Sequence, residues 1–265
     1  MTEALYLYDA YQTEFDASVV SVGESTVVLA ATAFYPTGGG QPCDTGILQV
    51  PDGREFRVLE VSKTPTGISH LLDASGLLVG SEVHGRVDWA RRLAHMRHHT
   101  ALHVLSGVVF RRFGSGITGG QIYADRARMD FSMPEFNREV AEKLIDEMNE
   151  VVRQNIPIRV RFVSRAEIQR DPSLVRVAAH LVPDVETVRL IDIEGFDVQA
   201  DGGTHVRSTA EVGLARLVGI ENKGSRNKRM TLALSSPGTP PVTEAQAAST
   251  PASTLERSHP RASEK

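Results

Sequence analysis

The stretch DWARRLAHMRHHTALHVLSGVVFRRFG, residues 88–114, decides the fold of this chain because it separates a β-rich segment from a mixed one. Asp88 can cap the start of a helix, and Gly114 can end it. The apolar residues near helical spacing are Leu93, Met96, Leu105 and Val108. The stretch therefore predicts one long helix that carries several histidines.

Upstream of this helix, residues 1–87 are rich in short runs of Val, Leu, Tyr and Thr that alternate with turn signals. The runs are VVSV, TVVLAATAFY, GILQV, FRVLEVS and EVHGRVDW. Strands of this length and spacing are typical of a small barrel or a curled sheet. We therefore predict an N-terminal β-barrel domain over residues 1–87.

Downstream, residues 88–234 mix helices and strands. Ser132 to Glu135 fits a capping box, which predicts the start of a second helix. Apolar residues continue that helix at spacings of three and four: Phe136, Val140, Leu144, Met148 and Val151. IYADRARMDF, IPIRVRFV and the segments after residue 187 are predicted strands, and GSGITGGQ is a predicted loop. The fold class is therefore α+β, a small barrel followed by an α+β domain.

The last segment, residues 235–265, holds five of the 13 prolines and no aromatic residue, so we expect a disordered tail. Cys43 is the only cysteine, which excludes an intrachain disulfide and is consistent with a reducing cytoplasm. The first residues lack the pattern of a secretory signal, and no apolar run is long enough to span a membrane. A net charge of −4 argues against a strongly basic nucleic-acid binder, and we expect no DNA partner.

Two histidines of the predicted helix, His99 and His103, are four residues apart and so share one face. A helix presents two nitrogen ligands to one metal ion in this way. A hydrogen-bonded histidine stripe would give the same spacing. His98 is rotated by about 100° from His99, whereas His95 lies one turn back and is either a ligand, a supporting group or a polyanion contact.

The loop Asp201-Gly-Gly-Thr-His205 brackets two glycines with an acid and a histidine. A tight turn can bring both side chains to one point, although a turn with a polar cap has the same residues. Joined to His99 and His103, they make a set of three imidazoles and one carboxylate. Such a donor set suits Zn²⁺.

The pairing of HTALH at 99–103 with DGGTH at 201–205 resembles the editing domain of alanyl-tRNA synthetases and the free-standing alanyl-tRNA editing proteins, AlaX. Three further motifs agree with this resemblance, in the same order. They are FYPTGGGQPCDTG at 34–46, RMDF at 128–131 and GIENKGSRNKR at 219–229. The resemblance covers nearly all of residues 1–234.

The resemblance implies one zinc ion per chain, held by His99, His103, position 201 and His205. The family pattern has cysteine at position 201, where this chain has aspartate. Asp201 is either a fourth ligand or a hydrogen-bond partner of a ligating histidine. We favour direct ligation, because carboxylate and thiolate are both anionic ligands.

The implied reaction is hydrolysis of the ester that joins a wrong amino acid to tRNA(Ala), with serine first and glycine second. The resemblance implies pocket roles for Gln41 and Thr118. Thr118 would contact the serine hydroxyl, since a site that bonds a hydroxyl rejects the analogue that lacks it. The sequence has no GxSxG motif, which disfavours a covalent intermediate. The metal either activates water or binds the substrate amino group.

Contact with tRNA requires local positive charge. Basic residues lie near the histidine helix and in the loop before the last predicted strand: Arg91, Arg97, Lys223, Arg226, Lys228 and Arg229. Two other functions remain open. One is a non-catalytic zinc module that binds tRNA or a synthetase, and the other is a deacylase of another aminoacyl-tRNA.

Overall fold

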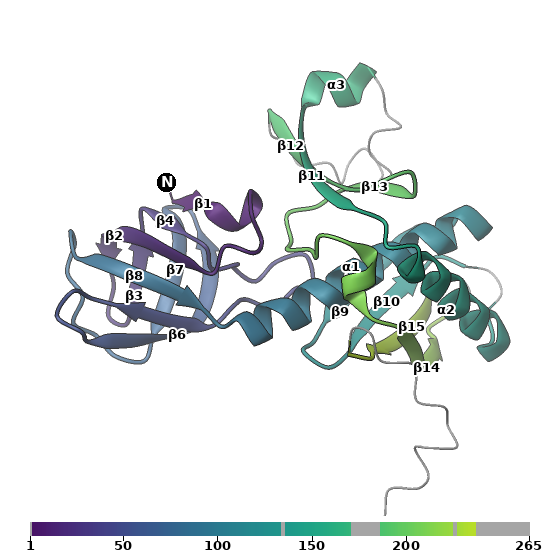
Figure 1. Cartoon of the computed structure of the whole chain (residues 1–265), viewed down its shortest axis with the longest axis horizontal. Coiled ribbons are helices and arrows are strands. Elements are labelled where there is room, and N and C mark those ends of the chain that lie inside the picture. Colours follow the sequence, from purple (N-terminus) through teal and green to yellow (C-terminus); the bar gives the residue numbers. More distant parts are fainter. Residues whose placement is uncertain (1, 134–135, 171–185, 225–226, 237–265) are drawn as a thin grey trace, which may run out of the picture.

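The computed structural model describes residues 2–133, 136–170, 186–224 and 227–236 (Figure 1). A barrel occupies one end, and the long helix α1 (Trp89–Phe113) runs from it into an α+β region. Within the described residues, no helix combines the length and the apolar character needed to cross a membrane. The expected tail begins at residue 235, but Ser235 is hydrogen-bonded to Leu214, and the part of the tail after residue 236 lies outside the described residues.

Six antiparallel strands close the barrel, in the order β2-β3-β7-β6-β5-β8. Their bounds are Glu14–Val22, Thr26–Leu29, Gly67–Leu72, Glu55–Thr64, Gly46–Gln49 and Glu82–Val87. Outside them, β1 (Glu3–Ala4) precedes a short 3-10 helix (Leu5–Leu7) and pairs in parallel with β4 (Ala31–Thr32). The predicted barrel is confirmed.

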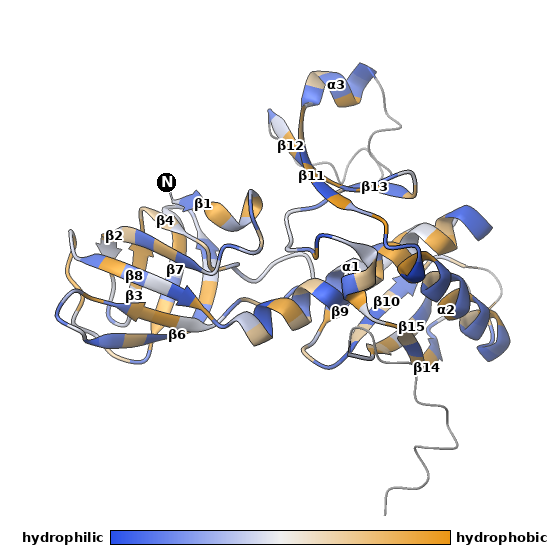
Figure 2. Cartoon of the chain, in the orientation of Figure 1, coloured by the Kyte–Doolittle hydropathy of each residue, from blue (hydrophilic) through white to orange (hydrophobic). Residues whose placement is uncertain are grey.

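Alternating side chains of these strands fill the barrel. In Figure 2, the barrel strands carry both hydrophobic and hydrophilic positions. Phe15, Phe34 and Leu48 are among the buried residues. The sequence patterns did not identify β7. Its His70 lies inside the barrel, fully buried, with its ring bonded to Thr32 Oγ1 at 2.9 Å. A buried histidine breaks the apolar pattern of a strand, but this hydrogen bond makes its burial possible.

Helix α1 begins as predicted, with the Asp88 side chain accepting a hydrogen bond from the Arg91 amide, and Gly114 ends it in a left-handed conformation. Every residue from His98 to Val109 is buried, so the helix is enclosed on all sides over three turns. Gly107 allows Phe196 to pack against the helix, since a Cβ there would lie 2.5 Å from the Phe196 ring. Polar side chains in this segment therefore need partners inside the protein.

A four-stranded sheet, β14-β15-β10-β9, packs with α1 and α2 (Arg138–Arg153). Its strands span Ala215–Asn222, Lys228–Leu234, Ala127–Phe131 and Ile117–Ile122. The predicted capping box at Ser132 is wrong. The Ser132 amide donates to Gly116 O and so continues the strand pairing, whereas Asn137 caps α2 by accepting from the Val140 amide at 2.9 Å.

The predicted GSGITGGQ loop is also wrong in part, because residues 117–122 form β9, which pairs with β10. Gly119 and Gly120 have low strand propensity, but the backbone ladder compensates. The predicted strand 122–131 turns at residues 123–126, where the Tyr123 amide bonds to Arg126 O. Thr118 therefore lies on a strand.

A second, three-stranded sheet, β11-β12-β13, stands beside residues 5–11, here called the N-terminal turn (Figure 1). Its strands span Ile158–Ser164, Thr187–Ile193 and Asp197–Ala200, and α3 (Arg165–Arg170) follows β11. Another short 3-10 helix (Thr209–Val212) lies against α1 and α2. The loop that carries residues 201–205 directly follows β13, so this sheet delivers that loop to α1.

The barrel has its own hydrophobic core, and the α+β region holds a larger core and a small third cluster on the three-stranded sheet. A barrel followed by mixed helices and strands confirms the predicted α+β class. Fully buried Arg92 of α1 joins the barrel to the rest. Its guanidinium pairs with Asp44 and donates to the backbone oxygens of Ala10 and Ala33. We propose that the barrel and the α+β region are two domains that meet at Asp88.

Candidate metal centre

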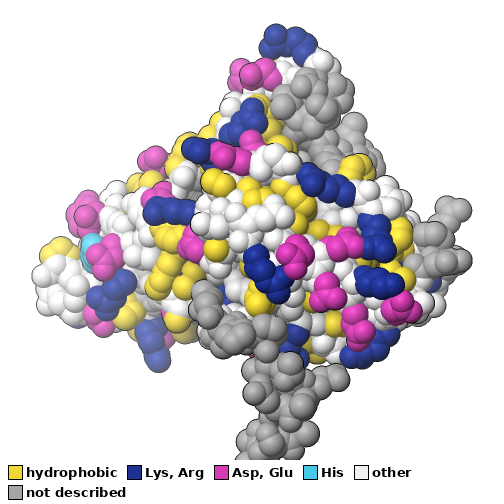
Figure 3. Space-filling view, turned by 45° about the vertical axis from the view of Figure 1, so that its right-hand side comes forward, with side chains coloured by type: hydrophobic (Ala, Val, Ile, Leu, Met, Phe, Trp, Pro, Cys, Tyr) yellow, Lys and Arg dark blue, Asp and Glu magenta, His cyan; other side chains and the backbone are white. Residues whose placement is uncertain are grey.

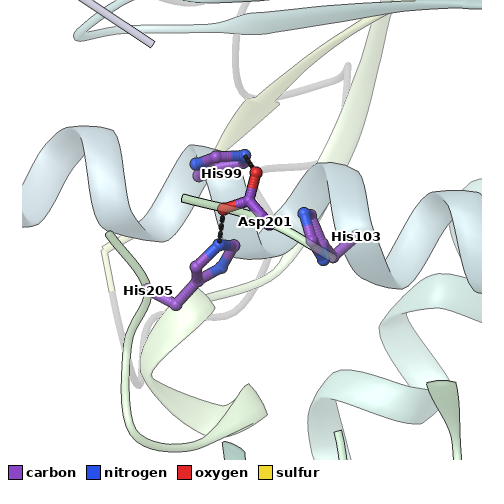
Figure 4. A group of neighbouring side chains, drawn as sticks. All are labelled: His99, His103, Asp201 and His205. Atoms are coloured by element: carbon purple, nitrogen blue, oxygen red, sulfur yellow. Dashed lines mark hydrogen bonds and ion pairs between the residues drawn. The ribbon is translucent and has the colours of Figure 1, made fainter. Parts of the chain in front are cut away.

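Four side chains from two distant segments meet beside α1 (Figure 4). His99 and His103 extend from successive turns of α1, and Asp201 and His205 come from the loop after β13. Each offers one ligand atom, and all four atoms lie within 4.8 Å of one another. The structure thus brings together the residues that the two motifs singled out, here called the His/Asp cluster.

The His/Asp cluster is compact and nearly closed. Asp201 Oδ2 lies 3.0 Å from His205 Nε2, and Asp201 Oδ1 lies 3.6 Å from His99 Nε2. The His205 ring centre is 4.4 Å from that of His99 and 4.5 Å from that of His103. The three histidines are buried, whereas the Asp201 side chain is 18% exposed. Solvent therefore reaches the cluster at its carboxylate.

Gly203 explains why a glycine is needed between the two loop residues. A Cβ at this position would lie 2.2 Å from His99 Cε1, closer than any side chain tolerates. The Gly203 amide also donates to Asp201 Oδ2 at 2.6 Å, which fixes the carboxylate. The loop backbone can therefore approach α1 only without a side chain at this position.

Gln41 sets the orientation of His99. The Thr204 amide donates to Gln41 Oε1 at 3.2 Å, and this N–H donor identifies Oε1 as the amide oxygen. His99 Nδ1 lies 2.9 Å from the same oxygen and must therefore carry its proton there. The lone pair of the neutral ring is then on Nε2, directed at the cluster. Gln41 is fully buried, and its Nε2 donates to Thr204 Oγ1.

The three glycines before Gln41 form the turn that delivers it. Gly39 and Gly40 adopt positive φ angles of 57° and 80°. A Cβ on Gly40 would lie 2.6 Å from Gly120 O, so the turn fits tightly against β9. The barrel thus reaches the His/Asp cluster through a hydrogen bond from a residue that the sequence marked as a pocket candidate.

Thr100 supports the opposite side of the cluster. Its Oγ1 lies 3.1 Å from His205 Nδ1, and it accepts a hydrogen bond from the Val206 amide at 3.3 Å. His205 Nε2 is therefore left for the cluster. The Thr100 hydroxyl is fully buried, so its pairing with a histidine does not make it a nucleophile.

Electrostatics give the cluster the protonation state that a cation requires. Burial lowers the pKa of His99 and of His205 below its usual value, so both rings are neutral near pH 7. Burial alone would raise the pKa of Asp201, but the neighbouring His99 and the His205 hydrogen bond outweigh it and lower that pKa. One carboxylate and two uncharged imidazoles, with the His103 ring beside them, make a donor set that fits a divalent transition metal.

We expect Gln41→Leu to weaken Zn²⁺ binding by about 10- to 100-fold, because His99 loses the partner that fixes its tautomer. Competition with a chromophoric chelator measures this affinity. Gln121→Leu is the comparison, since Gln121 Nε2 donates to Gly40 O in the glycine turn and has no contact with the cluster among the described residues. Equal affinities in the two variants would contradict this role of Gln41.

Two other histidines of α1 do not belong to the cluster. His98 Nδ1 donates to Ala94 O at 2.8 Å, which is a bond within the helix. His95 is buried, and burial lowers its pKa to about 4. His95 is not one of the four side chains that converge, so the geometry does not favour it as a ligand.

Thr118 lies on β9 with an exposed side chain, and its hydroxyl bonds to Asn227 Oδ1 at 3.3 Å. This hydrogen bond is the only one described for its hydroxyl. The structure brings Gln41 to the cluster directly, whereas it places Thr118 beyond the Gly40–Gly120 contact, on the same strand.

The predicted basic residues are dispersed, and most of them bind other groups of the chain. Arg91 donates to Cys43 O, and Arg97 donates to Val212 O and other backbone oxygens. Lys228 is buried and donates to Asn222 Oδ1 and Gly224 O, and Arg229 pairs with Asp130. Lys223 is exposed, and Arg226 lies outside the described residues. On the face shown in Figure 3, basic and acidic side chains alternate.

Sequence reasoning missed three supporting residues. Thr100 and Thr204 lie inside the two motifs, next to ligand candidates, and this adjacency was the available signal. Arg189 carried no signal of this kind. Its guanidinium donates to Leu7 O at 2.8 Å and to Asp201 O at 2.7 Å, so it fastens the cluster loop to the N-terminal segment.

Comparison with known families gives two matches. The family described as tRNA synthetases class II (A) matches residues 3–91. The family described as the threonyl and alanyl tRNA synthetase second additional domain matches residues 188–231. The second match includes the loop that carries Asp201 and His205.

Individual relatives are matched over most of this chain. The alanyl-tRNA editing protein AlaX-M of Methanosarcina barkeri is 41% identical over 241 residues, 88% of this chain and 99% of the relative. The protein of the same name from Saccharolobus solfataricus is 41% identical over 232 residues, 87% of this chain and 98% of the relative. The alanine–tRNA ligase of Pyrococcus furiosus is 41% identical over 227 residues, only 24% of that protein. The chain therefore belongs to the family of alanyl-tRNA editing proteins named AlaX-M.

Proposed function

We propose that this protein hydrolyses the ester of mischarged tRNA(Ala), with seryl-tRNA(Ala) as the first substrate and glycyl-tRNA(Ala) as the second. The observation that carries the proposal is the nearly closed His/Asp cluster in a chain that matches AlaX-M relatives almost from end to end. The reaction would take place in the cytoplasm, where tRNA is charged.

We propose Zn²⁺ as the cofactor, one ion per chain, held by His99, His103, Asp201 and His205. Three imidazoles and one carboxylate are donors that zinc accepts. When bound, zinc supplies a Lewis acid that can polarise a carbonyl or acidify water. A carboxylate gives the ion less charge than a thiolate would, so the aspartate at position 201 favours stronger Lewis acidity.

The chain's own residues then position the reacting groups. Gln41 and Thr100 hold the ring orientations of His99 and His205. The Asp201 carboxylate, fixed by the Gly203 amide, is the exposed edge of the cluster and the point at which a substrate arrives. An aminoacyl ester is reactive, so placing it and excluding misaligned water supplies much of the catalysis.

For serine selection, we propose Thr118 as the partner of the serine hydroxyl. Thr118→Val keeps the side-chain shape and removes the hydroxyl. We expect kcat/KM for seryl-tRNA(Ala) to fall about tenfold, the worth of one hydrogen bond. Glycyl-tRNA(Ala) is the control substrate because glycine has no hydroxyl. An equal loss for both substrates, or none for either, would rule out this role.

For tRNA contact, we retain Arg91 and Lys223 as proposed partners of the tRNA backbone. Lys223 is exposed. Arg91 lies at the start of α1, and its described side-chain hydrogen bond, to Cys43 O, uses Nε and not the two terminal nitrogens. The internal hydrogen bonds of Arg97, Lys228 and Arg229 favour a structural role for these three residues.

The experiment that tests the function compares hydrolysis of seryl-tRNA(Ala) and alanyl-tRNA(Ala) by zinc-loaded and by metal-stripped protein. The proposal expects rapid loss of serine, little loss of alanine, and recovery of the activity when zinc is restored. No hydrolysis by fully zinc-loaded protein would overturn it. Binding without hydrolysis would then indicate a tRNA-binding module, and hydrolysis of a different charged tRNA another deacylase.

A further inference from the structure

A cavity of about 620 Å³ borders the His/Asp cluster, because His205 forms part of its wall. The other walls are residues 8–11 of the N-terminal turn, strands β11 and β12, and residues 206–207. Figure 1 shows this turn facing β11 and β12. Its volume is in the range of ordinary ligand sites, which span roughly 300–1,000 Å³. A molecule held here lies against His205, the cluster residue that belongs to the described cavity wall.

Three guanidinium groups line the cavity, on Arg159, Arg189 and Arg207. Arg189 is only 8% exposed, and both of its described hydrogen bonds go to backbone oxygens. Within the described residues, no carboxylate is at ion-pair distance from it. Its charge therefore attracts an anion toward the side of the cavity next to Asp201.

The other two arginines are exposed at the rim. The Arg159 side chain is 65% exposed and pairs with Glu194, and the Arg207 side chain is 64% exposed and pairs with Asp9 at 3.2 Å. Exposed ion pairs contribute little to stability, so such guanidinium groups can exchange a carboxylate for a phosphate at small cost.

Aromatic rings accompany these charges. The Tyr8 side chain is 65% exposed, and its ring centre lies 5.3 Å from that of Phe162, which is 44% exposed on β11. The Arg207 guanidinium lies 4.1 Å above the Tyr11 ring. Exposed aromatic rings beside arginines are the combination on which single-stranded nucleic acids stack.

We propose that this cavity binds the single-stranded 3′ end of tRNA, with a base stacked on Tyr8 and phosphate groups on Arg159 and Arg207. This inference rests on the proposed function, because the 3′ end of tRNA carries the ester that the cluster would hydrolyse. The wall shared with His205 then explains how the ester arrives at the cluster. Arg189 attracts the last phosphodiester group of the strand while it holds the Asp201 backbone.

The first readout is binding, which does not depend on hydrolysis. The probe is a fluorescein-labelled RNA hairpin that ends in single-stranded ACCA, and a blunt hairpin is the comparison. Fluorescence anisotropy gives the Kd of each. We expect the native chain to bind the ACCA hairpin more tightly, and Tyr8→Ala to raise its Kd about tenfold or more. The double variant Arg159→Glu/Arg207→Glu should bind weakly and with a flatter salt dependence.

Arg153→Glu is the control, because Arg153 is an arginine of α2 that is 51% exposed and likewise pairs with a carboxylate, that of Glu150. It should bind as the native chain does. All three cavity residues are exposed, so their variants should fold, and thermal unfolding checks this. Native-like affinity in the folded Tyr8→Ala and double variants, or no preference for the ACCA end, would overturn the inference.

The second readout separates this inference from the proposed function. If the native chain hydrolyses seryl-tRNA(Ala), the cavity variants should raise KM, and an unchanged KM overturns the inference while the function stands. If the native chain hydrolyses nothing but the cavity variants lose ACCA binding, the inference stands and the function fails.

Discussion

His99→Ala should lower Zn²⁺ affinity by more than about 100-fold, because removing a group that only orients a ligand already costs 10- to 100-fold. The substitution removes the nitrogen that faces Asp201 Oδ1 and leaves the buried Gln41 oxygen with one donor fewer. Deacylation of seryl-tRNA(Ala) should fall with the metal. Zinc content after dialysis against a chelator, together with initial rates, measures both effects.

The neighbouring residue provides the control. His98 is buried on the same helix, but its described hydrogen bond goes to Ala94 O within α1. His98→Ala should therefore retain one zinc per chain and most of the activity. If both variants keep one zinc per chain, His99 is not a ligand. If both variants lose zinc to the same extent, the substitutions disturb α1 in general.

Arg92→Met should destabilise the protein by about 3–5 kcal/mol, the usual cost of breaking a buried ion pair from one side. Arg92 and Asp44 are both fully buried, so the substitution leaves an uncompensated carboxylate in the interior. The backbone oxygens of Ala10 and Ala33 also lose a donor. The urea midpoint should fall, and Tm should fall by about 10 °C.

Two comparisons test this explanation. Arg54→Met removes an arginine from an exposed pair with Asp52 on the barrel and should leave the urea midpoint nearly unchanged. The double variant Arg92→Met/Asp44→Leu removes both charges and should be more stable than Arg92→Met alone. A double variant that is less stable than the single one would show that the remaining bonds of Asp44, such as the one that it accepts from the Tyr35 amide at 2.6 Å, outweigh its unpaired charge.

Elements with strong local signals were predictable from the sequence. Asp88 and Gly114 bracket α1 as expected, since capping side chains and left-handed glycines act within one turn of the chain. The cluster was predictable for a similar reason. A helix fixes the spacing of His99 and His103, and two glycines leave Asp201 and His205 free to converge.

Features that depend on distant partners were not predictable. The Gly-Gly pair of β9 is a poor strand sequence, and only pairing with β10 makes residues 117–122 a strand. Ser132 had the residues of a cap, but its amide was already used by Gly116 O. The basic residues near the motifs could not be sorted from the sequence. Lys228 is buried and bonded within its own hairpin, whereas Lys223 of the same hairpin is exposed and has a long ion pair of 3.9 Å with Glu221.

Enclosure of α1 from His98 to Val109 fixes the rotation of the helix about its axis. Arg92 is locked to the barrel and His99 faces the cluster, seven residues and about 10 Å further along the axis. Inserting one residue between them would advance the cluster by about 1.5 Å but turn it by about 100°. The histidines would then face the hydrophobic core. We therefore expect the number of residues between Arg92 and His99 to be fixed, whereas the hairpin turns of the barrel should tolerate insertions.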